Sequence, residues 1–291
     1  MTEPQCKPRR SLLYVPAANQ RAMDKAKTLR ADMLTFDLED SAAPAAKEKA
    51  RAALVAQLAG DYGARELLVR VNAIDTRWVR DDIAAVAHTR VVGVMLPKVD
   101  GPETVREAAD LMEAAGASDA MTIWCMMETP LGILRAQEIA GASPRVAGFC
   151  MGLNDLGKAL GARQTQDRSA FQTSLGLALL AARSHGLAAI DSVFIDLGDE
   201  AGLIAECQQG RDLGFDGKSL IHPKQLDAAN RSFAPSADEI AAARDIIVAH
   251  GRATEEGKGV TVVDGRLVEA MHVAEAERLL ALAAAIETQA Q

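Results

Sequence analysis

Two acidic side chains stand where neighbouring strands of a parallel sheet are expected to end. The stretch from Thr122 to Asp155 predicts strand, loop, helix, strand and loop, with Glu128 at the end of the first strand and Asp155 just after the second. In parallel α/β proteins, ligands bind at the carboxyl ends of the strands. Mg²⁺ prefers oxygen ligands and keeps water or substrate oxygens in its shell, so a pair of carboxylates suits it. Glu128 and Asp155 are therefore the predicted metal ligands.

Short apolar runs alternate with amphipathic, alanine-rich stretches that have helical periodicity. Eight strands alternating with helices over about 230 residues favour an α/β fold, a (β/α)8 TIM barrel. A doubly wound sheet is the alternative, but no strand is followed by a GxGxxG motif. The predicted strands are Ser11–Pro16, Met33–Asp40, Leu67–Asn72, Gly93–Val99, Thr122–Glu128, Val146–Gly152, Ala189–Ile195 and Gly217–Ile221.

The composition changes near residue 235, which divides the chain into two predicted domains. Residues 1–235 are expected to form the barrel, and residues 236–291 a helical lid or arm that packs on a neighbouring subunit. Within the lid we predict a helix at Ser236–His250 that starts with a capping box. A small hairpin turning at Asp264-Gly265 and a final helix at Val268–Thr288 follow.

Further polar residues follow the other predicted strands. Asp37 and Glu39 are two apart and so share a face. Such residues often form structural salt bridges at a barrel rim, but their convergence on one rim favours a functional site. Asp155 could also be a helix N-cap, and His222 is expected to cap or pack because no HExxH spacing occurs. The other candidates are Arg70, Asn72, Lys98, Asn154, Asp191, Asp196 and Lys218.

The overall charge and the cysteines limit the possible classes of function. The net charge is −8, from 40 acidic and 32 basic residues, which argues against a nucleic-acid-binding protein. No apolar run approaches 20 residues, so no membrane span is expected. The N-terminus lacks the apolar region of a secretory signal, and the scattered cysteines fit a reduced, cytoplasmic compartment. Cys125 and Cys150 are predicted core residues. A basic cluster favours a phosphate-bearing ligand or is a solvated face: Lys7, Arg9, Arg10, Arg21, Lys25 and Lys27.

Seven motifs occur in order along nearly the whole chain. They are RSLLYVPA (10–17), FDLEDSAAP (36–44), VRVN (69–72), LPKV (96–99), METPLGI (127–133), MGLNDL (151–156) and GFDGKSLIHPKQ (214–225). With these motifs the sequence resembles the citrate lyase β-subunit-like branch of the HpcH/HpaI aldolase family. This branch includes malyl-CoA lyases, citramalyl-CoA lyases and (3S)-malyl-CoA thioesterases.

The resemblance implies a barrel with a C-terminal lid that assembles into trimers or hexamers, and it implies roles for individual residues. Glu128 and Asp155 would bind Mg²⁺, and Arg70 would contact the substrate beside the metal. The backbone from Gly152 to Asn154 would hold a substrate carboxylate. The CoA side would be lined by Tyr14, Lys25, Ile221 and His222, and possible supporting residues are Asp37, Glu39 and Lys98.

The resemblance also implies an acidic residue in the lid. Lyases of this family carry an aspartate there, which reaches the active site of a neighbouring subunit. The matching segment of this chain has Glu269, as in the thioesterase subgroup, and Glu269 is the candidate acid or base. The expected substrate is a malyl-CoA-like CoA thioester. It would be cleaved either at a C–C bond by a lyase or at the thioester by a thioesterase, and Glu269 favours the thioesterase. The alternatives are a citrate lyase β subunit acting on a carrier-protein thioester and a CoA-independent aldolase of hydroxy-keto acids.

Overall fold

The computed structural model describes residues 7–290 and divides the chain into two compact units. The barrel unit spans Arg9–Phe233, and the other unit comprises the two ends of the chain. Cys6 and the first residues of the predicted barrel domain lie outside the described part. Among residues 7–290, no helix is both long and apolar enough to cross a membrane.

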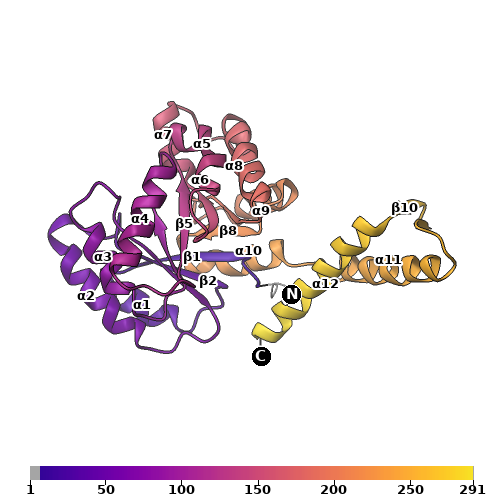
Figure 1. Cartoon of the computed structure of the whole chain (residues 1–291), viewed down its shortest axis with the longest axis horizontal. Coiled ribbons are helices and arrows are strands. Elements are labelled where there is room, and N and C mark those ends of the chain that lie inside the picture. The colour runs from indigo at the N-terminus through magenta and orange to yellow at the C-terminus, as the bar shows by residue number, and fades with distance from the viewer. Residues whose placement is uncertain (1–6, 291) are drawn as a thin grey trace. The chain divides into compact units, whose positions relative to one another are not determined.

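The barrel unit is a closed barrel of eight strands that pair in sequence order, with every pair parallel. Figure 1 shows the helices arranged around these strands. The predicted (β/α)8 barrel is confirmed, and the doubly wound alternative is wrong because β8 pairs with β1. The strands are β1 (Ser11–Pro16), β2 (Met33–Asp37), β3 (Glu66–Arg70), β4 (Gly93–Leu96), β5 (Thr122–Met127), β6 (Val146–Met151), β7 (Ala188–Asp191) and β8 (Gly217–Leu220).

Helices follow the strands along the chain. They form in the amphipathic stretches between the strands, because the apolar residues there recur at helical spacing and face the barrel. The helices of the barrel unit are α1 (Gln20–Ala26), α2 (Lys47–Leu58), α3 (Val79–Val86), α4 (Pro102–Ala114), α5 (Pro130–Leu134), α6 (Ala136–Ala140), α7 (Leu153–Leu160), α8 (Gln172–Ser184), α9 (Glu200–Leu213) and α10 (Leu226–Phe233).

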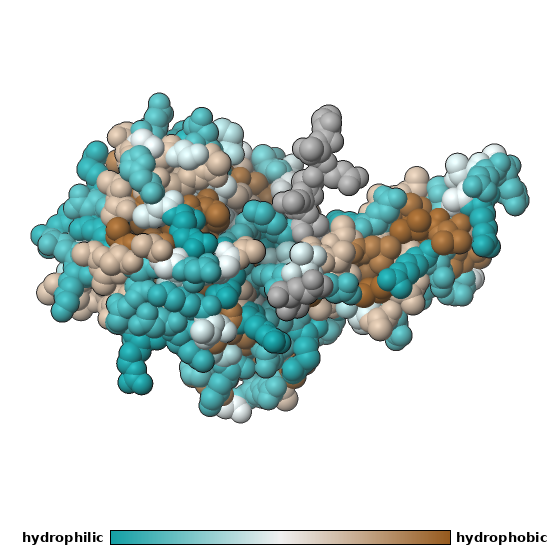
Figure 2. All heavy atoms as spheres, turned by 90° about the horizontal axis from the view of Figure 1, so that it is seen from below, coloured by the Kyte–Doolittle hydropathy of each residue, from teal (hydrophilic) through white to brown (hydrophobic). Residues whose placement is uncertain are grey.

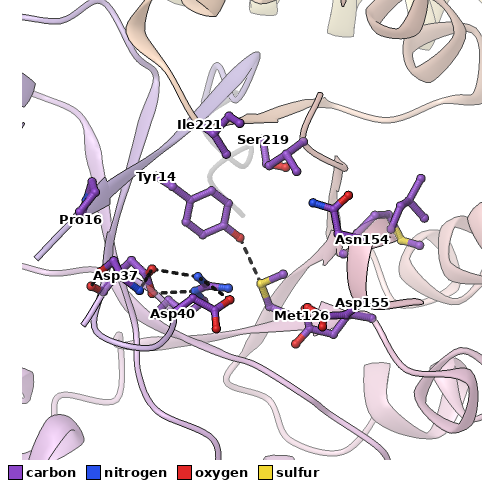
Figure 3. Close-up of a pocket in the computed structure, with 16 residues that line it drawn as sticks. Tyr14, Pro16, Asp37, Asp40, Met126, Asn154, Asp155, Ser219 and Ile221 are labelled. Atoms are coloured by element: carbon purple, nitrogen blue, oxygen red, sulfur yellow. Dashed lines mark hydrogen bonds and ion pairs between the residues drawn. The ribbon is translucent and has the colours of Figure 1, made fainter. Parts of the chain in front are cut away.

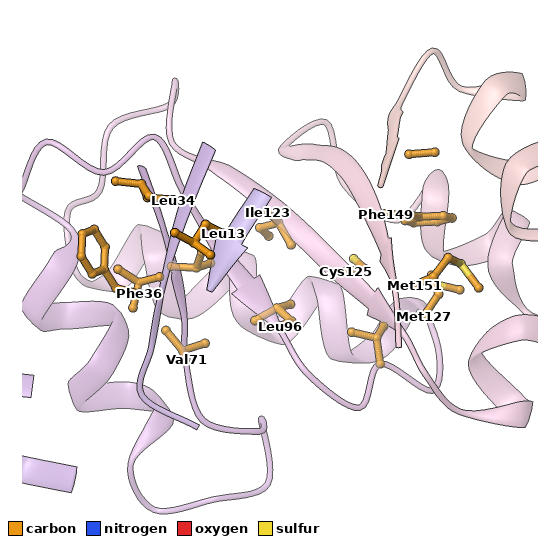
Figure 4. Packing of buried hydrophobic residues seen from close by; sticks show 14 of the residues in the cluster. Leu13, Leu34, Phe36, Val71, Leu96, Ile123, Cys125, Met127, Phe149 and Met151 are labelled. Carbon is orange, nitrogen blue, oxygen red and sulfur yellow. The ribbon is translucent and has the colours of Figure 1, made fainter. Parts of the chain in front are cut away.

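The apolar core has two layers because successive strand residues point to opposite faces of the sheet. The outer layer lies between strands and helices and includes Phe36 and Ile123 (Figure 4). The inner layer fills the barrel and includes Leu68 and Trp124. Cys125 and Cys150 are buried, as predicted. The same alternation that directs Leu68 and Trp124 inward places polar residues at the carboxyl rim two and four positions later.

The C-terminal unit contains α11 (Ala237–Glu255), β9 (Thr261–Val263), β10 (Arg266–Val268) and α12 (Ala270–Ala290). The predicted capping box at the start of α11 is present, and β9 pairs antiparallel with β10. Asp264 and Gly265, which join the two strands, have φ values of 49° and 75°, as a tight hairpin turn requires. Figure 2 shows hydrophobic side chains on the surface of this unit, and its exposed large apolar residues include Val262 and Met271.

Candidate active site

A cavity of about 340 Å³ opens at the carboxyl ends of the barrel strands. In Figure 3, Asp37 and Asp40 lie on one side of this cavity and Asn154 and Asp155 on the other, with Tyr14 between them. Every lining residue belongs to the barrel unit. The lining residues are Tyr14, Pro16, Asp37, Asp40, Ser41, Arg70, Met126, Glu128, Met151, Gly152, Leu153, Asn154, Asp155, Val193, Ser219 and Ile221.

The two predicted metal ligands meet in this cavity. Glu128 directly follows β5 and is only 2% exposed, whereas Asp155 lies in the first turn of α7, after β6. Gly152 is the N-cap of α7, so an N-cap role for Asp155 is wrong. The backbone at Gly152 lies directly against Glu128, because a Cβ at position 152 would be 2.5 Å from Glu128 Cβ and 2.7 Å from Glu128 Oε2. This close approach brings the start of α7 to the buried carboxylate.

Lys98 connects the two carboxylates. Its backbone N–H donates to Glu128 Oε1 at 2.7 Å, and its ammonium lies 2.8 Å from Asp155 Oδ2 and 3.5 Å from Glu128 Oε1. Its backbone has a φ of 52°, in the left-handed region that non-glycine residues seldom adopt. Burial raises the pKa of Glu128, and the positive charge of Lys98 counteracts that rise. Burial alone would lower the pKa of Lys98, but its hydrogen bond with Asp155 leaves this pKa above the usual value.

The donor set fits Mg²⁺. One ammonium group contacts both carboxylates, so Glu128 and Asp155 face a common point that a single cation can reach. No group of three or more His, Cys, Asp or Glu side chains with metal-binding geometry occurs among residues 7–290. A cation held by two carboxylates keeps most of its coordination positions for water or substrate oxygens, as is usual for Mg²⁺.

Arg70 is fixed opposite the carboxylate pair. Its guanidinium donates to both oxygens of Asp37 at 2.8 and 2.9 Å, contacts Glu39 at 3.1 Å and lies over the ring of Tyr14. Asp37 also accepts the backbone N–H groups of Glu39 and Ser41. Both oxygens of Asp37 are therefore engaged, and its part in the site is to hold Arg70 in place.

Glu39 is the acid of this rim whose protonation changes near neutral pH. Burial raises its pKa from 4.5 to about 7, although the positive charge of Arg70 acts in the opposite direction. The Tyr14 hydroxyl contacts Met126 Sδ at 3.1 Å and Met95 Sδ at 3.3 Å, and burial raises the pKa of Tyr14 further above its usual value. Glu39 can therefore exchange a proton near pH 7. Tyr14 lines the cavity and remains neutral.

The residues assigned to the CoA side divide into two groups. Tyr14 and Ile221 line the cavity, as do Gly152 and Asn154. Lys25 lies on the exposed side of α1 and does not line the cavity. His222 caps the short 3-10 helix Pro223–Gln225 by accepting the N–H of Lys224, which confirms the capping prediction. Contact of Lys25 and His222 with CoA stays a prediction, as does the role of Glu269, which stands between β10 and α12 in the C-terminal unit.

Several polar candidates are structural. Asn72 is turned toward α3, where it donates to Asp82 at 2.6 Å. Asp191 and Lys218 belong to a buried ion-pair network that Arg168 and Glu206 complete.

The basic N-terminal cluster is in part engaged elsewhere. Arg9 pairs with Glu66 and Arg10 with Asp32, so these two arginines do not support the phosphate-binding interpretation of the cluster.

Sequence analysis did not single out most of the apolar wall. Pro16, Met126, Leu153 and Val193 line the cavity. Pro16 and Leu153 fall within the motifs RSLLYVPA and MGLNDL, whereas the only sequence signal of Met126 and Val193 is their position within a predicted strand.

The chain is similar to known proteins over most of its length. Residues 10–223 match the family model described as HpcH/HpaI aldolase/citrate lyase. A (3S)-malyl-CoA thioesterase of Cereibacter sphaeroides is 49% identical over 97% of this chain and 97% of its own. An L-malyl-CoA/beta-methylmalyl-CoA lyase of the same species is 32% identical over 94% of both chains. The citrate lyase subunit beta of Escherichia coli is 38% identical over 90% of this chain and 88% of its own. Among solved structures, CitE from Mycobacterium tuberculosis in complex with magnesium, acetoacetate and coenzyme A has a TM-score of 0.77 and 30% identity, covering 94% of this chain and 97% of that one.

Proposed function

The chain belongs to the HpcH/HpaI aldolase/citrate lyase family, and from that premise we propose that it is a Mg²⁺-dependent thioesterase of a malyl-CoA-like substrate. As a family member it is an enzyme of CoA thioesters, either a thioesterase or a lyase. The observation that carries the proposal is the cavity that Glu128, Asp155 and Arg70 line together. The thioesterase is preferred because the thioesterase relative is 49% identical to this chain, against 32% for the lyase relative.

Each side of the cavity can bind one part of such a substrate. Glu128 and Asp155 would hold Mg²⁺, which when bound supplies a Lewis acid for the substrate hydroxyl and carboxylate oxygens. The first N–H groups of α7, at Asn154 and Asp155, have no partner within a helix and can donate to the substrate carboxylate. Arg70 can stabilise negative charge that develops on the thioester carbonyl oxygen.

The fixed position of the Arg70 guanidinium matters for catalysis. Because Asp37 fixes the guanidinium with two hydrogen bonds, little reorganisation is needed when charge develops on the substrate. Glu39, whose pKa burial raises to about 7, contacts Arg70 but does not line the cavity, so its part is to hold Arg70 rather than to exchange a proton with the substrate. We propose that Glu269 in the lid is the acid or base, and the resemblance of its sequence segment to the thioesterase subgroup supports this role.

Cleavage of the C–C bond is the second candidate, because the same arrangement would stabilise the enolate that a lyase forms. A citrate lyase β subunit acting on a carrier protein, and an aldolase that works without CoA, are not favoured by the relatives. Assembly into trimers or hexamers, the packing of residues 236–291 on a neighbouring subunit and a cytoplasmic location stay predictions.

The test is a product analysis with the purified protein, Mg²⁺ and (3S)-malyl-CoA. Free thiol, malate and glyoxylate are quantified in the same samples. We expect malate with stoichiometric CoA thiol and no glyoxylate. Glyoxylate with acetyl-CoA and little thiol would identify a lyase. Absence of turnover with this substrate would contradict the proposal. The Glu128→Ala protein serves as the control that links any product to this cavity.

A further inference from the structure

Ser192 follows β7 and is hydrogen-bonded both to Asp191 and Lys218 of the buried ion-pair network and to the start of α7. It is 1% exposed and does not line the cavity. Its hydroxyl oxygen accepts the backbone N–H of Leu153 at 3.2 Å. Leu153 is the first residue of α7, the helix that carries Asn154 and Asp155.

The backbone of Ser192 is fixed on both sides. Its N–H donates to Asp191 Oδ1 at 2.8 Å, and its carbonyl oxygen accepts from Lys218 Nζ at 2.6 Å. Asp191 in turn accepts both contacts of Arg168, at 2.7 and 2.8 Å, and Lys218 donates to Glu206 at 2.6 Å. These charged groups are buried or nearly so, so breaking one of their contacts leaves a buried charge without its partner. The hydroxyl of Ser192 is therefore held at a fixed point.

The start of α7 depends on the Ser192 hydroxyl because this helix has no other side-chain cap. Gly152, the N-cap residue, has no side chain that could accept a helix N–H, and no side-chain cap is present. Ser192 supplies the missing acceptor from the loop after β7. Its bond uses the N–H of Leu153, and the next two N–H groups, at Asn154 and Asp155, have no partner within the helix.

We propose that Ser192 is a positioning residue of the active site, through which the buried network of Arg168, Asp191, Glu206 and Lys218 sets the position of Asp155. This inference rests on the proposed function, because it assigns the metal to Glu128 and Asp155. Partners that orient metal ligands change metal affinity by about 10- to 100-fold when they are removed. Ser192 acts on Asp155 through the helix backbone rather than by direct contact.

The test uses Mn²⁺, which accepts the same oxygen ligands as Mg²⁺ and whose free concentration can be followed by electron paramagnetic resonance. The full-length protein is titrated as wild type, Ser192→Ala and Ser192→Thr. We expect Ser192→Ala to bind Mn²⁺ about 10-fold more weakly than wild type. Ser192→Thr, which keeps an oxygen acceptor, is expected to bind more tightly than Ser192→Ala. Thermal unfolding confirms that each variant is folded.

The matched control is Ser11→Ala. Ser11 is also buried, and its hydroxyl also accepts a backbone N–H, that of Asp32 at 3.1 Å, but it lies at the first position of β1 and does not line the cavity. We expect the Ser11→Ala protein to bind Mn²⁺ as the wild type does.

Three results would overturn the inference. These are Ser192→Ala binding like wild type, Ser11→Ala losing as much affinity as Ser192→Ala, and Ser192→Thr binding more weakly than Ser192→Ala. Failure of the wild type itself to bind Mn²⁺ would instead refute the proposed metal site, so the two failures can be told apart.

Discussion

Replacing Gly152 by alanine tests how closely α7 must approach the metal site. The φ of Gly152 is −117°, which any residue adopts, so backbone strain does not enter the expectation. The new Cβ would instead lie 2.5 Å from Glu128 Cβ and 2.7 Å from Glu128 Oε2, where ordinary contact begins at 3.4 Å. Glu128 or the start of α7 must therefore move by somewhat less than about 1 Å in a closely packed interior.

A displacement of this size is large for a Mg²⁺ site, because Mg²⁺ demands near-ideal octahedral geometry with bonds of about 2.0–2.1 Å. We expect Gly152→Ala to bind Mn²⁺ or Mg²⁺ about 10- to 100-fold more weakly. The overpacking should also lower the free energy of unfolding by about 1–3 kcal/mol. Metal titration followed by electron paramagnetic resonance and denaturant unfolding measure the two effects.

The control substitution is Gly176→Ala in α8. An added Cβ at Gly176 meets nothing within 4 Å, and alanine favours a helix interior over glycine by about 0.5–1 kcal/mol. We expect this variant to gain stability and to bind metal as the wild type does. A Gly152→Ala protein that binds metal and turns over substrate within about twofold of wild type would refute the steric argument.

Three further predictions concern the rim. Glu128→Ala and Asp155→Ala should each abolish Mg²⁺-dependent turnover, and full activity of either protein would remove that residue from the metal site. Arg70→Ala should lower kcat/KM by about 100-fold or more through loss of a fixed positive charge, whereas an unchanged rate would exclude Arg70. The pKa of Glu39 is raised from 4.5 to about 7, so the folded state binds more protons than the unfolded chain in this pH window, and stability falls as pH rises through it. Glu39→Gln should remove this slope, at most about 1.4 kcal/mol per pH unit, in urea unfolding followed between about pH 5 and 7. A slope that persists in Glu39→Gln would show that another group causes it.

The barrel could be predicted from the sequence because strand and helix periodicities alternate clearly, but the strand ends could not. The second strand was expected to reach Asp40 and ends at Asp37, although Leu38 is still buried. Apolar residues continue into the loop there, so burial alone does not mark the end of the strand. The fourth strand was expected to reach Val99 and ends at Leu96, shortly before Lys98 takes up a left-handed backbone. Such a conformation in a lysine has no sequence signal.

The sequence predicts which polar residues reach the rim better than it predicts which of them pair with each other. Period-two alternation correctly brings Asp37, Arg70 and Glu128 into one cavity. Asp191 lies on the opposite face of the sheet, because Ala188 and Ile190 point into the barrel, and it pairs with Arg168, a residue from a loop 23 positions earlier. Which charges pair with each other depends on loop geometry, which the sequence pattern does not reveal. The raised pKa of Glu39 likewise depends on burial in the folded chain.

The buried ion-pair network and the apolar wall of the cavity differ in how freely their residues can be substituted, in evolution or in redesign. Behind β7 and β8, at positions that do not line the cavity, the charged residues are bound to each other, so substitutions there must occur together or cost stability. On the apolar wall, Pro16 and Val193 line the cavity and can vary one at a time, whereas Met126 also belongs to the buried core and contacts Tyr14. New acyl specificity should therefore arise by single substitutions on this wall, and libraries for altered substrates are best concentrated there while the ion-pair side is left unchanged.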